Sequence, residues 1–124
     1  MKSNSTIKPD TLTSREKDGS RLYAYDITES TVTDENGNAQ TVYDYQQVRV
    51  FEPVTANKIL AAVLAAVYDQ SYELKLVNEY NSAVNGLYDD DTATAKKEAY
   101  TAYLTERARL KALVDSDCAT LGIA

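Results

Sequence analysis

The pattern of apolar and polar residues divides the chain into three parts. Residues 1–20 are mostly Ser, Thr, Lys, Asp and Gly with almost nothing to bury, which predicts a flexible N-terminal arm that is disordered unless a partner orders it. Residues 21–33 and 39–52 are rich in Tyr, Val and Thr, as β-strands are. Asn36-Gly37 lies between them, and because both residues tolerate a positive φ, the sequence predicts a β-hairpin over 21–52.

Pairing about that turn sets Tyr23 roughly opposite Val50 and Tyr25 roughly opposite Val48. Neither face of the hairpin is wholly polar. On the first strand, alternation separates Tyr23, Tyr25 and Ile27 from Leu22, Ala24 and Val32, and on the second it separates Val42, Val48 and Val50 from Tyr43, Tyr45 and Phe51. A lone two-stranded hairpin is marginally stable in water, so this one must pack on a helix or on another chain.

The segment ILAAVLAAV, residues 59–67, contains no charge and is predicted to be a helix, with Pro53 ending the strand before it and Thr55 as its N-cap. At 100° per residue its bulky side chains share one face and its alanines share the other. Two interpretations stay open: the alanine face is mostly exposed, or another helix approaches closely over it. The bulky residues are Ile59, Leu60, Val63, Leu64 and Val67, and the alanines are Ala61, Ala62, Ala65 and Ala66.

Beyond this helix the apolar stripe changes direction near residues 69–71. That shift favours a break, with Asp69 or Ser71 capping a second helix that ends near Asn85-Gly86; one long helix is the alternative. A third helix is predicted to begin near Thr92 or Thr94, to end near Gly122 and to return antiparallel to the second. Its expected apolar stripe is Ala99, Tyr103, Leu110, Leu113 and Val114, with Tyr100 at its edge, while Glu98, Thr105, Arg109, Lys111 and Asp115 are expected to point away.

These elements predict an α+β fold: an N-terminal β-hairpin, residues 21–52, followed by a three-helix region that resembles a helical hairpin, residues 54–122, in one globular unit that is oligomeric or docked on partners. The length of 124 residues fits one domain. The net charge of −6, with basic residues scattered along the chain, argues against nucleic acid as a partner. The longest apolar run is about half the ~20 residues that span a bilayer, so no membrane association is expected.

Motifs for catalysis and for metal binding are missing from the sequence. The chain has no histidine, which removes the commonest general base, and its single cysteine, Cys118, is expected to be an inert or surface thiol. Residues 34–45, DENGNAQTVYDY, superficially resemble a calcium loop, with Asp34, Asn36 and Asn38 at alternate positions. Ala39, however, stands where the loop needs Gly, and Tyr45 stands where it needs Glu. The aspartates at 89–91 are expected to be solvated charges at a helix start. We therefore expect no enzyme, no cofactor and no metal site.

The segment YDYQQVRVFEPVTANKILAAVLAAVYDQSYELKLVNEYNSA, residues 43–83, resembles small accessory proteins from the structural gene modules of tailed phages and prophages of gut bacteria. The resemblance implies a non-catalytic virion protein, assembled in the host cytoplasm, that binds other phage structural proteins or copies of itself. The alternatives are a tail or fibre assembly chaperone and a cytoplasmic regulatory binding module. The candidate interaction residues are Tyr23, Tyr25, Tyr43, Tyr45, Phe51, Ala61, Ala62, Ala65 and Ala66.

Overall fold

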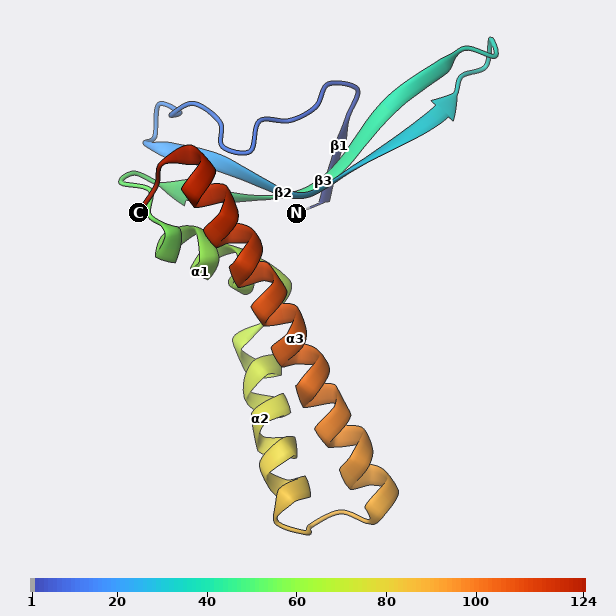
Figure 1. The fold of residues 1–124 in the computed structure, drawn as a ribbon, viewed down its shortest axis with the longest axis vertical. Coiled ribbons are helices and arrows are strands. Elements are labelled where there is room, and N and C mark those ends of the chain that lie inside the picture. The colour runs from blue at the N-terminus through green and yellow to red at the C-terminus, as the bar shows by residue number, and fades with distance from the viewer. Residues whose placement is uncertain (1) are drawn as a thin grey trace.

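A three-stranded antiparallel sheet followed by three helices makes up the fold in the computed structural model, which describes residues 2–124 (Figure 1). The strands are β1 (Lys2–Ser5), β2 (Ser20–Thr33) and β3 (Ala39–Phe51), in the spatial order β1-β3-β2. The helices are α1 (Ala56–Val67), α2 (Gln70–Val84) and α3 (Asp90–Leu121). The predicted α+β architecture, a β-hairpin followed by three helices, is therefore confirmed.

The N-terminal arm is part of the sheet, which corrects the expectation that it is disordered without a partner. β1 pairs with the edge of β3, from Lys2 opposite Gln46 to Ser5 opposite Tyr43. Residues 11–13 run along the outer edge of β2, where the Thr13 N–H donates to the Leu22 carbonyl at 3.0 Å, and Leu12 is buried in the core. The sequence pattern does not predict this pairing, because backbone hydrogen bonds to a strand edge require no apolar pattern.

The β2–β3 hairpin forms at the predicted turn, but its register differs from the simple two-residue pairing. Tyr23 lies opposite Val48, and Tyr25 lies opposite Gln46. The pairing is shifted by two residues in total. The turn accounts for one of them, because it is a three-residue loop centred on Asn36, with Gly37 at φ 81°. The other comes from a β-bulge between Tyr25 and Thr28 on β2. Beyond the bulge Val32 lies opposite Gln40, on the face that Tyr23 occupies rather than the face of Leu22 and Ala24.

The core lies between one face of the sheet and the helices α1 and α3. Ile59 and Val63 of α1 are fully buried, as the bulky stripe predicts, and Leu60 and Leu64 pack at its margin. The sheet and α3 complete the core with Tyr23, Tyr25, Val48, Val50, Leu110, Val114 and Cys118. Tyr23 and Tyr25 are therefore packing residues, and the expectation that they are surface interaction residues is wrong.

The break between the first two helices is confirmed, since α1 ends at Val67 and α2 begins at Gln70 with Asp69 as its N-cap. α3 begins at Asp90, earlier than predicted, because the Asp89 carboxylate accepts the Thr92 N–H at 2.7 Å and caps it. It ends with Gly122 in the left-handed conformation and runs antiparallel beside α2 (Figure 1). Ala99 is exposed rather than part of the buried stripe, which instead extends to Cys118.

Two parts of the molecule extend away from this core in different directions (Figure 1). One is the far end of the β2–β3 hairpin, where residues 28–40 are all exposed. The other, which we call the helical projection, consists of α2 with residues 90–106 of α3.

No helix within residues 2–124 has the length and apolar character that crossing a membrane requires.

Candidate functional site

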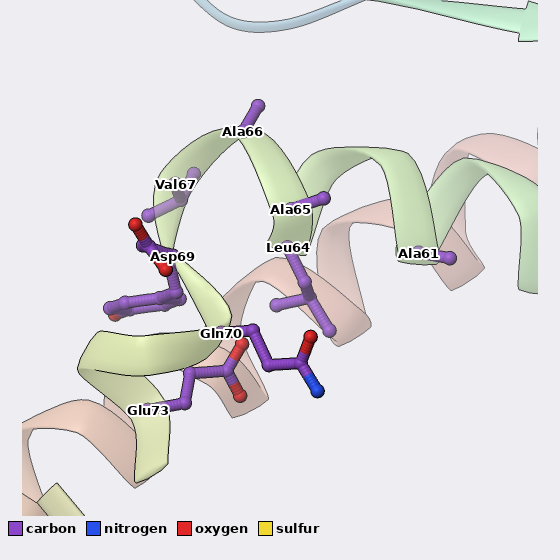
Figure 2. A pocket seen from close by; sticks show the side chains of 9 residues that line it. Ala61, Leu64, Ala65, Ala66, Val67, Asp69, Gln70 and Glu73 are labelled. Atoms are coloured by element: carbon purple, nitrogen blue, oxygen red, sulfur yellow. The ribbon is translucent and has the colours of Figure 1, made fainter. Parts of the chain in front are cut away.

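A groove of about 660 Å³ opens where α1 turns into α2 (Figure 2). We call it the corner groove. Apolar side chains of α1 form one wall, and polar side chains at the start of α2 form the other. Its lining residues are Ala61, Leu64, Ala65, Ala66, Val67, Tyr68, Asp69, Gln70 and Glu73.

Local backbone bonds create the corner. The Tyr68 N–H donates to the Leu64 carbonyl at 2.7 Å and closes α1, while the Asp69 carboxylate accepts the Ser71 N–H at 2.8 Å and starts α2. No residue separates the two helices except Tyr68 and Asp69, so the second helix axis must turn sharply. Figure 2 shows that the alanines of α1 point in different directions: Ala61 and Ala65 lie along one side of the helix, whereas Ala66 points away from Gln70 and Glu73.

The structure separates the four predicted alanines into two groups. Ala61, Ala65 and Ala66 are exposed and line the groove, in agreement with the interpretation that the alanine face is mostly exposed. Ala62 is half-buried and packs against the core, so its assignment to an exposed face is wrong. Val67, expected in the core stripe, is exposed in the groove because the helix ends there and the core does not reach it.

Tyrosines hold the corner against α3. The Tyr68 ring meets Tyr103 edge-on with 4.9 Å between centroids and stacks beside Tyr72. The Tyr103 hydroxyl donates to the Glu73 carboxylate, and this bond, followed by burial, raises the pKa of Tyr103. This bond fixes Glu73 at the edge of the groove. Asp69 also lines the groove, which therefore combines an apolar wall with an acidic rim.

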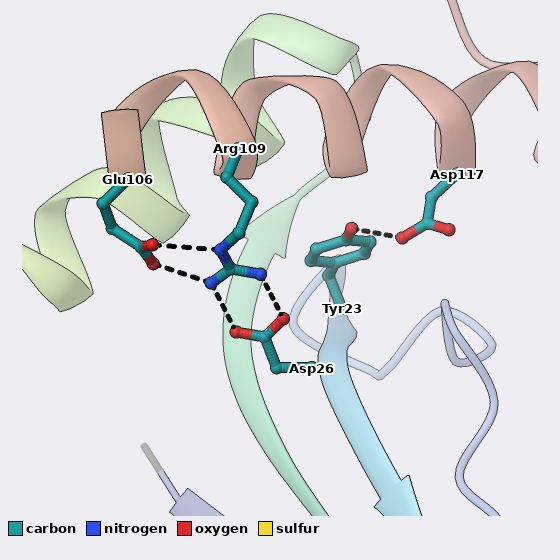
Figure 3. Close-up of polar contacts among 5 residues, drawn as sticks. All are labelled: Tyr23, Asp26, Glu106, Arg109 and Asp117. Atoms are coloured by element: carbon teal, nitrogen blue, oxygen red, sulfur yellow. Dashed lines mark hydrogen bonds and ion pairs between the residues drawn. The ribbon is translucent and has the colours of Figure 1, made fainter. Parts of the chain in front are cut away.

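A second polar cluster fastens α3 to the sheet (Figure 3). Arg109 donates to both oxygens of Asp26, at 2.8 and 3.0 Å, and also to the carboxylate of Glu106. These bonds lower the pKa values of Asp26 and Glu106 and raise that of Arg109. Arg109 was expected to point into solvent; it reaches the sheet because the β-bulge presents Asp26, at φ 50°, toward α3.

Beside that cluster, the buried Tyr23 hydroxyl donates to Asp117 (Figure 3). Burial first, and then the bond to Asp117, raises the pKa of Tyr23 well above its usual value. Neither the Arg109–Asp26 pair nor the Tyr23–Asp117 pair was found from the sequence. Their partners lie on elements far apart along the chain, and no spacing rule joins them.

The remaining predicted interaction residues lie on β3. Tyr43 and Tyr45 are half-buried on the strand that β1 and β2 flank, and Phe51 is exposed at the end of that strand. By strand alternation all three belong to the face opposite Val48 and Val50. They do not meet the corner groove, so the structure divides the candidate residues between two surfaces.

The carboxylates considered for metal binding have local partners. The Asp34 side chain accepts the N–H groups of Asn36 and Asn38, both at 2.9 Å, and Asp89 caps α3. Within residues 2–124, no three His, Cys, Asp or Glu side chains are grouped so that they could hold a metal ion. Cys118 is buried, and burial raises the pKa of its thiol.

No protein-family model, curated protein or solved structure matches this chain.

Proposed function

We propose that this protein is a non-catalytic structural protein that binds other chains through the corner groove, in the manner of phage virion accessory proteins. The observation that carries the proposal is the corner groove, which is lined by exposed Ala61, Ala65, Ala66 and Val67 together with half-buried Leu64. The assignment to a phage particle, assembled in the host cytoplasm, is supported by the resemblance of residues 43–83 alone.

The groove's chemistry defines the segment that would occupy it. Alanines allow the backbone of a neighbouring helix or strand to approach closely, and burial of apolar surface supplies the free energy of association. Asp69 and Glu73 on the rim favour a basic residue at the flank of that segment. The partner is therefore a protein segment with a small apolar face and a Lys or Arg beside it.

An assembly chaperone or adaptor would use the same surface transiently. Mass spectrometry of purified particles from the host that carries the gene separates the two functions. A virion component is present in a fixed copy number, whereas a chaperone is present in assembling cells and missing from finished particles. The proposal of a virion component fails if the particles lack the chain.

Ala65→Glu tests the groove itself. Ala65 is exposed, so the fold should be unchanged, but a carboxylate placed against the apolar face of a partner loses its hydration. We expect incorporation into particles to fall at least about tenfold, which corresponds to ~1.4 kcal/mol of binding free energy.

Ala112→Glu is the matched control, because Ala112 is also an exposed helical alanine but lies on α3 away from the groove. It should leave incorporation unchanged. Equal incorporation of both variants would show that the groove does not bind the partner, while circular dichroism verifies that both variants are folded.

A further inference from the structure

The chain that leaves β1 presents the most exposed large apolar side chain of residues 2–124. Ile7 is 77% exposed, and Lys8 beside it is also exposed. The Ser5 hydroxyl accepts the Ile7 N–H at 3.1 Å and so forms a turn at the end of the strand. Pro9 then restricts Lys8 to an extended backbone. We call residues 6–9 the β1 exit segment; it is short, extended and anchored at one end by β1.

The charge of this part of the chain differs from that of the whole protein. Lys2 and Lys8 are the only charged residues among residues 2–9, whereas the chain has a net charge of −6. Lys8 forms no ion pair with any other residue that the structure describes. The β1 exit segment is therefore a small apolar surface with a cation at its flank.

The corner groove has the complementary surface. Ala61, Ala65 and Val67 are exposed on its apolar wall, and Asp69 and Glu73 lie on its rim. Within residues 2–124, neither carboxylate forms an ion pair with a Lys or Arg side chain. An isoleucine placed against the wall buries apolar area on both sides, and a lysine beside it meets the acidic rim.

Leu74 is the other exposed large apolar side chain of residues 2–124 that a basic residue follows directly, and it fits the groove less well. It lies on α2 between Glu73 and Lys75. Docking Leu74 of another copy brings the Glu73 of that copy toward the acidic rim, where like charges repel. The β1 exit segment carries no carboxylate and avoids this repulsion.

We propose that the β1 exit segment of one copy of this chain occupies the corner groove of another copy. The proposal rests on the proposed function, because it uses the same groove, and it makes a second copy the occupant. In Figure 1 the chain that leaves β1 and the corner between α1 and α2 lie on opposite sides of the sheet, so a copy does not fill its own groove.

The two surfaces are different, so the contact between copies is heterologous. Every copy that is added leaves one groove and one segment free. Association therefore continues beyond the dimer, into a ring if the rotation between copies closes and into a filament if it does not.

The size of the contact sets its strength. Four extended residues span about 13 Å at ~3.3 Å per residue, and α1 from Ala61 to Val67 spans about 9 Å at ~1.5 Å per residue. The segment is thus long enough to cover the wall, but the contact is far smaller than the ~800 Å² per partner of a standard interface. We expect a dissociation constant above about 10 µM.

Sedimentation velocity of the purified full chain, from about 1 to 500 µM, tests the proposal. We expect a monomer at the lowest concentrations and species larger than a dimer at the highest. Ile7→Asp removes the apolar side chain, and Ala65→Lys places a cation in the groove against Lys8, so each should weaken association at least about tenfold. Leu87→Asp is the matched control, because Leu87 is 73% exposed in the α2–α3 loop, and it should leave association unchanged.

A mixture of the two variants tests the head-to-tail arrangement. The Ile7→Asp chain keeps its groove, and the Ala65→Lys chain keeps its β1 exit segment. An equimolar mixture should therefore form a one-to-one dimer that grows no further, although each variant alone stays monomeric. A mixture that stays monomeric while the unchanged chain associates overturns the arrangement.

The role of the charge is tested at Lys8. Lys8→Glu should weaken association, because it turns the attraction to Asp69 and Glu73 into repulsion, whereas Lys8→Arg should leave it unchanged. Equal association of both variants would show that the acidic rim does not hold the segment.

A chain that stays monomeric up to about 500 µM, or association that Ile7→Asp or Ala65→Lys leaves intact, overturns the proposal. Neither result affects the proposed function, which the incorporation of Ala65→Glu into particles tests separately. Particles that lack the chain contradict the virion function and leave the self-association in place.

Discussion

Leu110 is the residue whose truncation most directly tests the packing of α3 on the sheet. It is 1% exposed and belongs to the core cluster with Tyr23, Val48 and Ile59. Leu110→Ala removes three carbons, which at ~0.8 kcal/mol each contribute about 2.4 kcal/mol of transfer free energy. The cavity adds to this, because a helix fixed to a sheet cannot collapse fully into the space. We expect a total loss of about 3–4 kcal/mol in the free energy of unfolding.

That loss is a large part of the ~5–15 kcal/mol by which a domain of this size is stable. It should lower Tm by about 10–15 °C. Urea unfolding followed by circular dichroism measures it, with an unchanged m value showing that the native state is preserved. All measurements belong at one protein concentration, because self-association would otherwise change the apparent stability.

Leu87→Ala is the matched control, since Leu87 is 73% exposed in the α2–α3 loop. The same three carbons are removed there from a side chain already in water, so the change should stay within about 0.5 kcal/mol. If Leu110→Ala costs less than about 1.5 kcal/mol, or no more than Leu87→Ala, then α3 does not pack on the sheet as described.

Three further predictions concern ionisable groups. Arg109 lowers the pKa of Asp26 in the folded state, so the stability from this pair is complete above the unfolded pKa of about 3.9 and is lost as pH falls through the folded value. Asn tolerates the positive φ of residue 26, so Asp26→Asn should keep the fold. Below pH ~4 the urea midpoint of this variant should depend less on pH than that of the unchanged protein, and an equal dependence in both proteins would contradict the prediction. Burial and Asp117 raise the pKa of Tyr23, so its contribution is complete below pH ~10 and lost above it. Tyr23→Phe should lower the free energy of unfolding by about 1 kcal/mol at neutral pH and should reduce the loss of stability at alkaline pH. If the stability of the variant and of the unchanged protein falls equally steeply above pH ~10, Tyr23 does not have this role. The buried Cys118 thiol should react with a disulfide reagent at least about 100-fold more slowly in the native protein than in urea, and comparable rates would show that the thiol is accessible.

Local signals in the sequence were sufficient for most of the secondary structure. Asn36-Gly37 marked the hairpin turn, Thr55 the start of α1 and Gly122 the end of α3. The shift of the apolar stripe at residues 69–71 located the break between α1 and α2. Each of these features depends on residues within one or two turns of chain, so a reading of neighbouring positions finds them.

The candidate surfaces were predicted only in part, and the exceptions share one cause. Tyr23 and Tyr25 have strand propensity and a polar tip, which suit either a surface or a core; the helices that cover them put them in the core. Ala62 lies between the two faces of α1, and only the neighbouring core decides that it packs inward. Whether such a residue is exposed depends on which elements pack against it in the folded protein.

The sequence by itself determined the hairpin turn, the three helices with most of their ends, and the bulky side of α1, because these follow from short-range backbone preferences and periodicity. The tertiary structure alone decided the edge pairing of β1, the bulge that shifts the register, and the contacts of Arg109 with Asp26 and of Tyr103 with Glu73. Those contacts join residues 30 to 83 positions apart. No local propensity specifies them, since each exists only when two separately formed elements are brought face to face by burial of the core between them.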